Sequence, residues 1–119
     1  MKIEFLIFEL DNQKYGIEVK YVQQILRHSV KEDESNLIDL RKIFGLDSSS
    51  AGQSVRLTYK VRIFRIRTDA VYEIRSFDKS EVDRIKKNNY IDKLFYSAIQ
   101  TDDGIIVNLD IEELLNTLS

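Results

Sequence analysis

The chain has 119 residues, the length of one compact domain, and with 43% hydrophobic and 32% charged residues its composition is that of a globular protein; we expect a single domain over residues 1–119. The net charge of −2 predicts no general affinity for nucleic acids or anionic membranes, and no run of about 18 apolar residues could span a membrane. The absence of cysteine excludes disulfides and thiolate chemistry and favours a cytoplasmic location.

The first patterned segment, Phe5–Leu10, is apolar at both parities, which is typical of a strand buried on both faces. Residues 11–14 (Asp-Asn-Gln-Lys) predict a turn, because Asp and Asn tolerate the left-handed backbone conformation. Residues 15–19 predict the returning strand, with one buried side and one side that faces solvent. The spacing then becomes helical or irregular at Val22, Ile25 and Leu26.

A loop and a short helix are predicted next. The charged run at residues 31–34 (Lys-Glu-Asp-Glu) is typical of a solvated loop. Asp39 has the properties of a helix N-cap, and Gly45 suits the position just after the helix C-terminus. The apolar face of this helix is formed by Leu40, Ile43 and Phe44.

Residues 55–67 alternate between apolar and basic side chains, which indicates β-structure. Because this run is longer than one average strand, we expect a tight turn near Tyr59-Lys60. The basic side chains form a possible nucleic-acid-binding stripe, which consists of Arg56, Arg62, Arg65 and Arg67. The alternative is a solvated strand face whose arginines pair with acidic neighbours such as Glu73.

The C-terminal third predicts a helix, a hairpin and a second helix. A short helix is expected to begin at residues 78–80 and to end at Asn88-Asn89. Strands at residues 95–99 and 105–109 flank a turn at residues 101–104, which ends in the Asp-Gly signature. The closing helix begins with a capping box and presents its apolar face through Leu114, Leu115 and Leu118.

Several segments together resemble CheW-like domains, which are the chemotaxis coupling proteins and the matching regulatory domain of the chemotaxis histidine kinase. The similar segments are residues 5–10 (Phe-Leu-x-Phe-x-Leu), 15–17 (Tyr-Gly-Ile), 22–25 (Val-Gln-x-Ile), 38–41 (Ile-Asp-Leu-Arg) and 68–74, with Asp69 and Val71 as anchors. The resemblance implies a mostly-β fold of small SH3-like antiparallel β-barrels with short helices. It also implies a non-catalytic adaptor that docks a histidine-kinase regulatory domain, a chemoreceptor tip or another signalling protein.

The chain departs from this family before the short helix. Family members have a strand hairpin there with an Asn-Leu-Arg-Gly motif and then a proline, whereas this chain has the charged run at residues 31–34, and Asn36 stands where the proline would be. Without that hairpin, the sheet is expected to have an open edge. Pairing of this edge with a second copy predicts a weak homodimer, and protection of the edge by charge predicts a monomer.

The resemblance places partner-facing residues at Val22, Gln24 and Ile25, although Val22 could equally be part of the core. No residue is predicted to be catalytic or to bind a metal or cofactor. The single histidine, His28, has no companion cysteine or histidine, and the chain has no glycine-rich phosphate loop. The arginine stripe leaves a second hypothesis, a small barrel that binds single-stranded nucleic acid.

Overall fold

The computed structural model describes residues 1–26, 37–47, 52–84 and 91–117. Six strands form the larger sheet: β1 Lys2–Leu10, β2 Gln13–Glu18, β7 Ala70–Asp78, β8 Asp83–Arg84, β9 Phe95–Thr101 and β10 Gly104–Leu109. Their order across the sheet is β7-β1-β2-β10-β9-β8. Four strands form the smaller sheet: β3 Val22–Leu26, β4 Leu37–Asp39, β5 Gln53–Tyr59 and β6 Arg62–Thr68. Their order is β3-β5-β6-β4.

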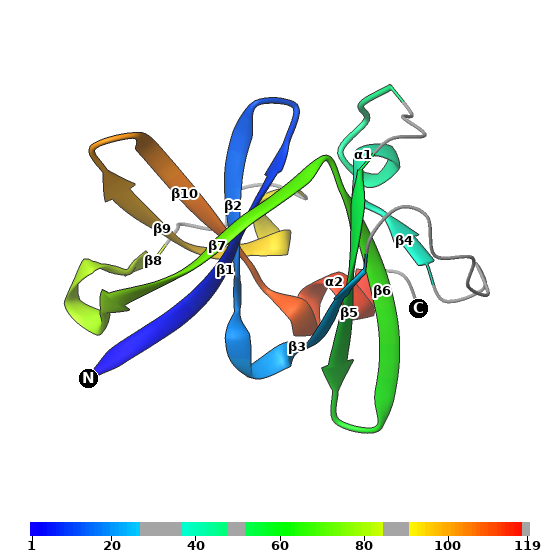
Figure 1. The fold of residues 1–119 in the computed structure, drawn as a ribbon, viewed down its shortest axis with the longest axis horizontal. Helices are drawn as coiled ribbons and strands as arrows, with labels where there is room; N and C mark the ends of the chain where they lie inside the picture. The colour runs from blue at the N-terminus through cyan, green and yellow to red at the C-terminus, as the bar shows by residue number, and fades with distance from the viewer. Residues whose placement is uncertain (27–36, 48–51, 85–90, 118–119) are drawn as a thin grey trace.

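Short helices join and cover these sheets: α1 Leu40–Ile43, α2 Ile111–Thr117, and the 3-10 helices η1 Val19–Tyr21, η3 Lys79–Glu81 and η4 Ile91–Leu94. Figure 1 shows the larger sheet on the left, the smaller sheet on the right and α2 between them. The predicted mostly-β fold with short helices is confirmed, although the pairings of β2 with β10 and of β4 with β6 are parallel rather than antiparallel. Within the described residues, neither sheet closes into a barrel, because the first and last strands of each order are not paired with each other.

Strand β1 is buried on both faces, as its sequence predicts. Leu6, Phe8 and Leu10 belong to the main core, which β1 shares with residues of both sheets and of α2. Phe5 and Ile7 point to the other face of the larger sheet, into a second core whose buried residues all come from strands of that sheet. That second core is completed by Phe77, Ile99 and Ile106. Because its two faces are apolar, β1 connects the two cores.

Two tight turns follow from local backbone chemistry. Asp11 and Asn12 form the turn between β1 and β2 with φ angles of 51° and 66°, and β2 already begins at Gln13. A turn with two positive φ angles matches the twist of a hairpin, and Asp and Asn tolerate it. The expected turn near residue 60 is also present, because Lys60 and Val61 connect β5 to β6. Lys60 takes a φ of 55°.

The short helix α1 has the ends that its sequence predicts. The Asp39 side chain accepts a hydrogen bond from the backbone N–H of Arg41 at 3.2 Å, as an N-cap does. Gly45 has a φ of 74° and donates to the Lys42 carbonyl, while Leu46 donates to the Arg41 carbonyl. These two bonds form a Schellman motif, for which a glycine is well suited. The ordered end of α1 holds Arg41 in a fixed place.

The structure resolves one sequence-based expectation and contradicts another. The spacing of residues 22–26, which is helical or irregular in the sequence, belongs to a strand in which a register shift between Val22 and Gln24 disturbs the strict alternation. The helix expected from residues 78–80 onward is only the 3-10 turn η3, capped by Asp78. The chain then becomes strand β8, which pairs with β9 through Asp83 and Arg84. The expected end of that helix, at residues 88–89, lies outside the described residues.

Candidate protein-binding surface

The predicted partner-facing residues all lie on β3, at an edge of the smaller sheet. Among the described strands, β3 pairs with β5 alone. Ile25 is 42% exposed and Gln24 is exposed, whereas Val22 is half-buried and packs against the main core. An edge strand with an exposed apolar side chain offers both backbone hydrogen-bonding groups and apolar contact to a partner.

Neighbouring side chains fix the geometry of this edge. Gln24 lies opposite Arg56 of β5, and its Oε1 accepts a hydrogen bond from Arg56 Nη1 at 3.1 Å. Ile25 lies opposite Val55, whose side chain is fully buried. The buried neighbours hold β3 in place, and Gln23, Gln24 and Ile25 are its exposed residues, with Gln24 on the same face as Arg56 and Ile25 on the same face as Val55. We call the exposed residues 23–25 the β3 edge.

The four arginines of the predicted basic stripe do not share one exposed face. The turn at residues 60 and 61 places Arg62 opposite Tyr59, while Arg65 lies opposite Arg56. Opposite residues project from the same face of a sheet, so Arg62 is on a different face from the other three. Arg65 is only 7% exposed, and Arg67 is half-buried.

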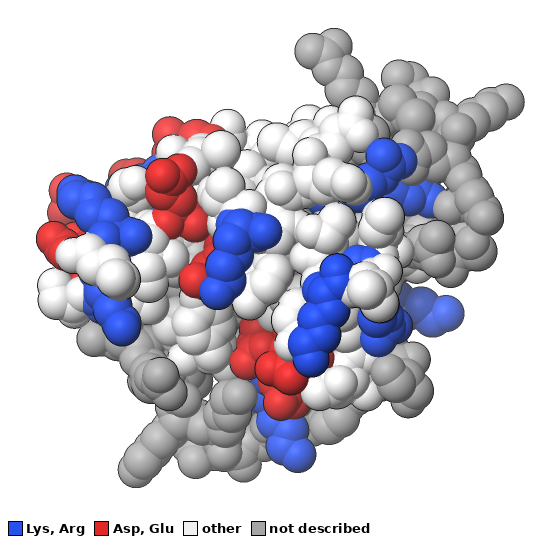
Figure 2. Space-filling model, turned by 90° about the horizontal axis from the view of Figure 1, so that it is seen from below, with Lys and Arg blue, Asp and Glu red and all other residues white. Residues whose placement is uncertain are grey.

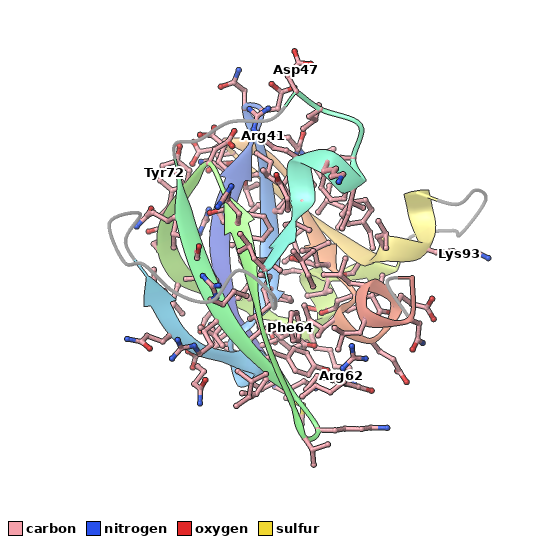
Figure 3. The ribbon with its side chains drawn as sticks, turned by 90° about the vertical axis from the view of Figure 1, so that its right-hand side faces the viewer. Arg41, Asp47, Arg62, Phe64, Tyr72 and Lys93 are labelled. Atoms are coloured by element: carbon pink, nitrogen blue, oxygen red, sulfur yellow. The ribbon has the colours of Figure 1, made fainter. Side chains whose placement is uncertain are left out.

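The surface charges on the face drawn in Figure 2 are mixed rather than basic. Figure 2 shows the molecule from below, and on this face lysine and arginine side chains are interspersed with acidic ones. Figure 3 shows Arg62 near the end of the β5–β6 hairpin, away from the position of Arg41. The four arginines of the predicted stripe therefore do not form one continuous exposed surface of the kind that tracks a nucleic-acid backbone. This observation does not favour the nucleic-acid hypothesis.

An ion pair links the two sheets at the end of the molecule that lies opposite the tip of the β5–β6 hairpin, as Figure 3 shows. Arg41 follows β4 of the smaller sheet, and Asp69 lies at the junction where the chain passes from β6 to β7. The Arg41 Nε and Nη2 atoms donate to the Asp69 carboxylate at 2.8 and 2.9 Å. The same carboxylate accepts the backbone N–H of Asp11 at 2.8 Å. Arg41 also donates to the carbonyl of Asp47 at 2.8 Å, and Figure 3 shows these two residues close together.

The ion pair between Arg41 and Asp69 has a structural role. The hydrogen bonds from Arg41 hold the pKa of the Asp69 carboxyl below its usual value, and the Asp11 N–H adds to the effect. Sequence reasoning identified Arg41 and Asp69 only separately, since they are 28 positions apart. The only indication in the sequence that the two residues matter was that each occurs in a segment that resembles a CheW-like motif.

We expect Asp69→Asn to lower the free energy of unfolding at pH 7 by about 1 kcal/mol, because it removes the carboxylate that accepts charge-assisted hydrogen bonds. A carboxyl whose pKa is lower in the folded state stabilises above its unfolded pKa of about 3.9, and loses this effect as the pH falls through the folded value. The difference between wild type and Asp69→Asn should therefore shrink below about pH 4. Urea denaturation at pH 7, 5 and 3 measures it.

The matched control is Asp103→Asn, which removes one charge from an exposed turn residue. This variant should stay close to the wild type at every pH. A loss of stability in Asp69→Asn that is the same at pH 7 and pH 3 would contradict the role assigned to the ion pair.

The described residues contain no group of three or more histidine, cysteine, aspartate or glutamate side chains that could hold a metal ion. Over the same ranges, no helix is both long enough and apolar enough to cross a membrane. The features that remain at the β3 edge are its exposed apolar side chain and a side with which no described strand pairs.

Comparison with known proteins found a similar structure but no similar sequence. No protein-family model and no curated protein matches the sequence. The structure is similar to the crystal structure of the scaffolding protein TtCheW from Thermoanaerobacter tengcongensis, with a TM-score of 0.78 and 20% sequence identity. The similarity covers 93% of this chain and 90% of that chain. The chain therefore has the fold of the CheW scaffolding protein.

Proposed function

We propose that this protein is a non-catalytic scaffold module of chemotaxis-type signalling. In this role it docks a histidine-kinase regulatory domain, a chemoreceptor tip or another signalling protein in the cytoplasm. The observation that carries the proposal is the likeness in fold to a scaffolding protein over nearly the whole chain. The proposed contact is the β3 edge together with Val22.

The physical chemistry of the β3 edge supports this role. Protein partners commonly bind to sheet edges through backbone hydrogen bonds, and side chains such as Ile25 supply the apolar contact that gives specificity. Such docking requires no acid, base or nucleophile. The hydrogen bond between Gln24 and Arg56 holds the polar part of this surface in one arrangement before a partner arrives.

We expect Ile25→Asp to weaken binding of the histidine-kinase regulatory domain by at least about tenfold, since it places a charge where the partner would cover an apolar side chain. Isothermal titration calorimetry with the purified regulatory domain from the same organism measures the change. Because Ile25 is exposed, the melting temperature of the variant should stay close to that of the wild type.

The matched control is Ile105→Asp. Ile105 is 48% exposed but lies on β10 of the larger sheet, so the same substitution there should leave binding unchanged. Val22→Asp separates the two roles of Val22: weaker binding with normal melting supports a partner contact, whereas early melting identifies a core residue. Equal binding by the wild type and Ile25→Asp would refute the proposed contact.

A further inference from the structure

Strand β7 is an edge strand with exposed apolar side chains. It pairs with β1 along its length, and no described strand pairs with its other side. Tyr72 and Ile74 are 53% and 55% exposed. In Figure 1, β7 crosses in front of β1 near the centre of the view. Proteins usually protect such an edge with charged side chains, lysine above all, or with proline, a β-bulge or a covering element; β7 has the charged residues Glu73, Arg75 and Asp78 but neither lysine nor proline.

The regular part of β7 has a symmetric charge pattern. A register shift opposite Tyr72 interrupts the pairing, whereas Glu73–Asp78 pair regularly with β1. In this part Ile74 is flanked by Glu73 and Arg75. The Arg75 Nε atom lies 3.9 Å from Glu73 Oε1, which is longer than a hydrogen bond. The two charges therefore form only a loose pair within the strand.

We propose that β7 pairs antiparallel with β7 of a second copy of the chain, about a twofold axis at Ile74. In this register Ile74 faces Ile74 of the second copy, and Glu73 of each copy faces Arg75 of the other. Tyr72 faces Ser76 in the same way. The larger sheets of the two copies then form one continuous sheet.

The charges select this register. A twofold axis perpendicular to two antiparallel strands requires one residue to face its own copy. With the axis at Glu73, two carboxylates face each other, and with the axis at Arg75, two guanidinium groups do. Directly opposite side chains have Cβ atoms about 4.5 to 5.5 Å apart, so like charges there destabilise pairing and opposite charges stabilise it. Of these three positions, Ile74 alone gives two attractive pairs.

The contact is small, since it uses about five residues of each copy, and we expect a dissociation constant of about 0.1 to 1 mM. The proposed contact uses β7, whereas the self-association predicted from the sequence was placed at the sheet edge beside the charged run at residues 31–34. That run lies outside the described residues. The β7 contact is also independent of the proposed function, since β7 belongs to the larger sheet and the β3 edge to the smaller one.

Light scattering and sedimentation equilibrium from about 10 µM to about 1 mM test the proposal. The mass of the wild type should rise from 14.0 kDa toward twice that value. Glu73→Arg alone and Arg75→Glu alone should each remain monomeric, because each variant places like charges opposite each other. An equimolar mixture of the two variants should associate at least as well as the wild type, since every facing pair is then attractive.

The control is Arg62→Glu, which makes the same change of charge as Arg75→Glu but at an exposed site on β6. It should associate like the wild type. A wild type that stays monomeric up to about 1 mM would overturn the proposal. So would single variants that associate normally, or a mixture of variants that fails to associate although both have normal circular dichroism spectra and melting temperatures.

Discussion

Replacing Phe8 with alanine should lower the free energy of unfolding by about 3 to 5 kcal/mol, which is the usual cost of deleting a buried phenylalanine side chain. Phe8 is fully buried in the main core, and its ring stacks on that of Tyr15 with centroids 5.6 Å apart. Tyr15 in turn stacks on Phe95. The substitution therefore opens a cavity where residues of β1, β2 and β9 meet. Since domains of this size have a total stability of about 5 to 15 kcal/mol, the loss is large.

Urea denaturation followed by circular dichroism measures this loss. Phe5→Ala tests the other face of β1 and should cost a similar amount, because Phe5 is fully buried in the second core. Val61→Ala is the control, since Val61 is 97% exposed and its replacement should change stability by no more than about 0.5 kcal/mol. A Phe5→Ala variant as stable as the wild type would show that β1 is not buried on both faces.

Gly16→Ala should be nearly as damaging, although it adds only one methyl group. Gly16 on β2 faces Asn108 on the parallel strand β10, and a Cβ at position 16 would overlap the Asn108 Oδ1 atom. Asn108 is fully buried, and its Nδ2 donates to Ser97 Oγ at 2.9 Å. Displacing Asn108 breaks this bond and strains the packing, so we expect a loss of about 2 to 4 kcal/mol.

A double-mutant cycle tests the cause of this effect. In a background that carries Asn108→Ala, the side chain that would overlap is gone, so adding Gly16→Ala should cost less than about 1 kcal/mol. Equal costs of Gly16→Ala in the two backgrounds would show that Asn108 is not the reason for the glycine. The melting temperature of each variant provides an independent measurement.

Local chemistry made much of this fold predictable from the sequence. The apolar residues at both parities of residues 5–10 predict the buried strand β1, and the tolerance of Asp11 and Asn12 for positive φ predicts the first turn. Asp39 and Gly45 predict both ends of α1 for the same kind of reason. Each of these features depends on residues that are close in the sequence.

Features that depend on distant residues were not predictable. The bond between Arg41 and Asp69 joins positions 28 apart, and no spacing rule links them. The alternation of the arginines suggested one basic stripe, but the two-residue turn at residues 60–61 places Arg62 on a different face from Arg65. The register shift in β3 likewise depends on its pairing with β5, so periodicity alone did not indicate a strand.

The most direct test of the proposed scaffold function is capture of partners from the protein's own cells. Tagged wild type, Ile25→Asp and Ile105→Asp are used as baits, and the retained proteins are identified by mass spectrometry after nuclease treatment. We predict that the wild type and Ile105→Asp retain a chemotaxis-type histidine kinase or a chemoreceptor, and that Ile25→Asp loses it. A wild type that retains no such signalling protein, or an identical set of signalling proteins with all three baits, would contradict the account.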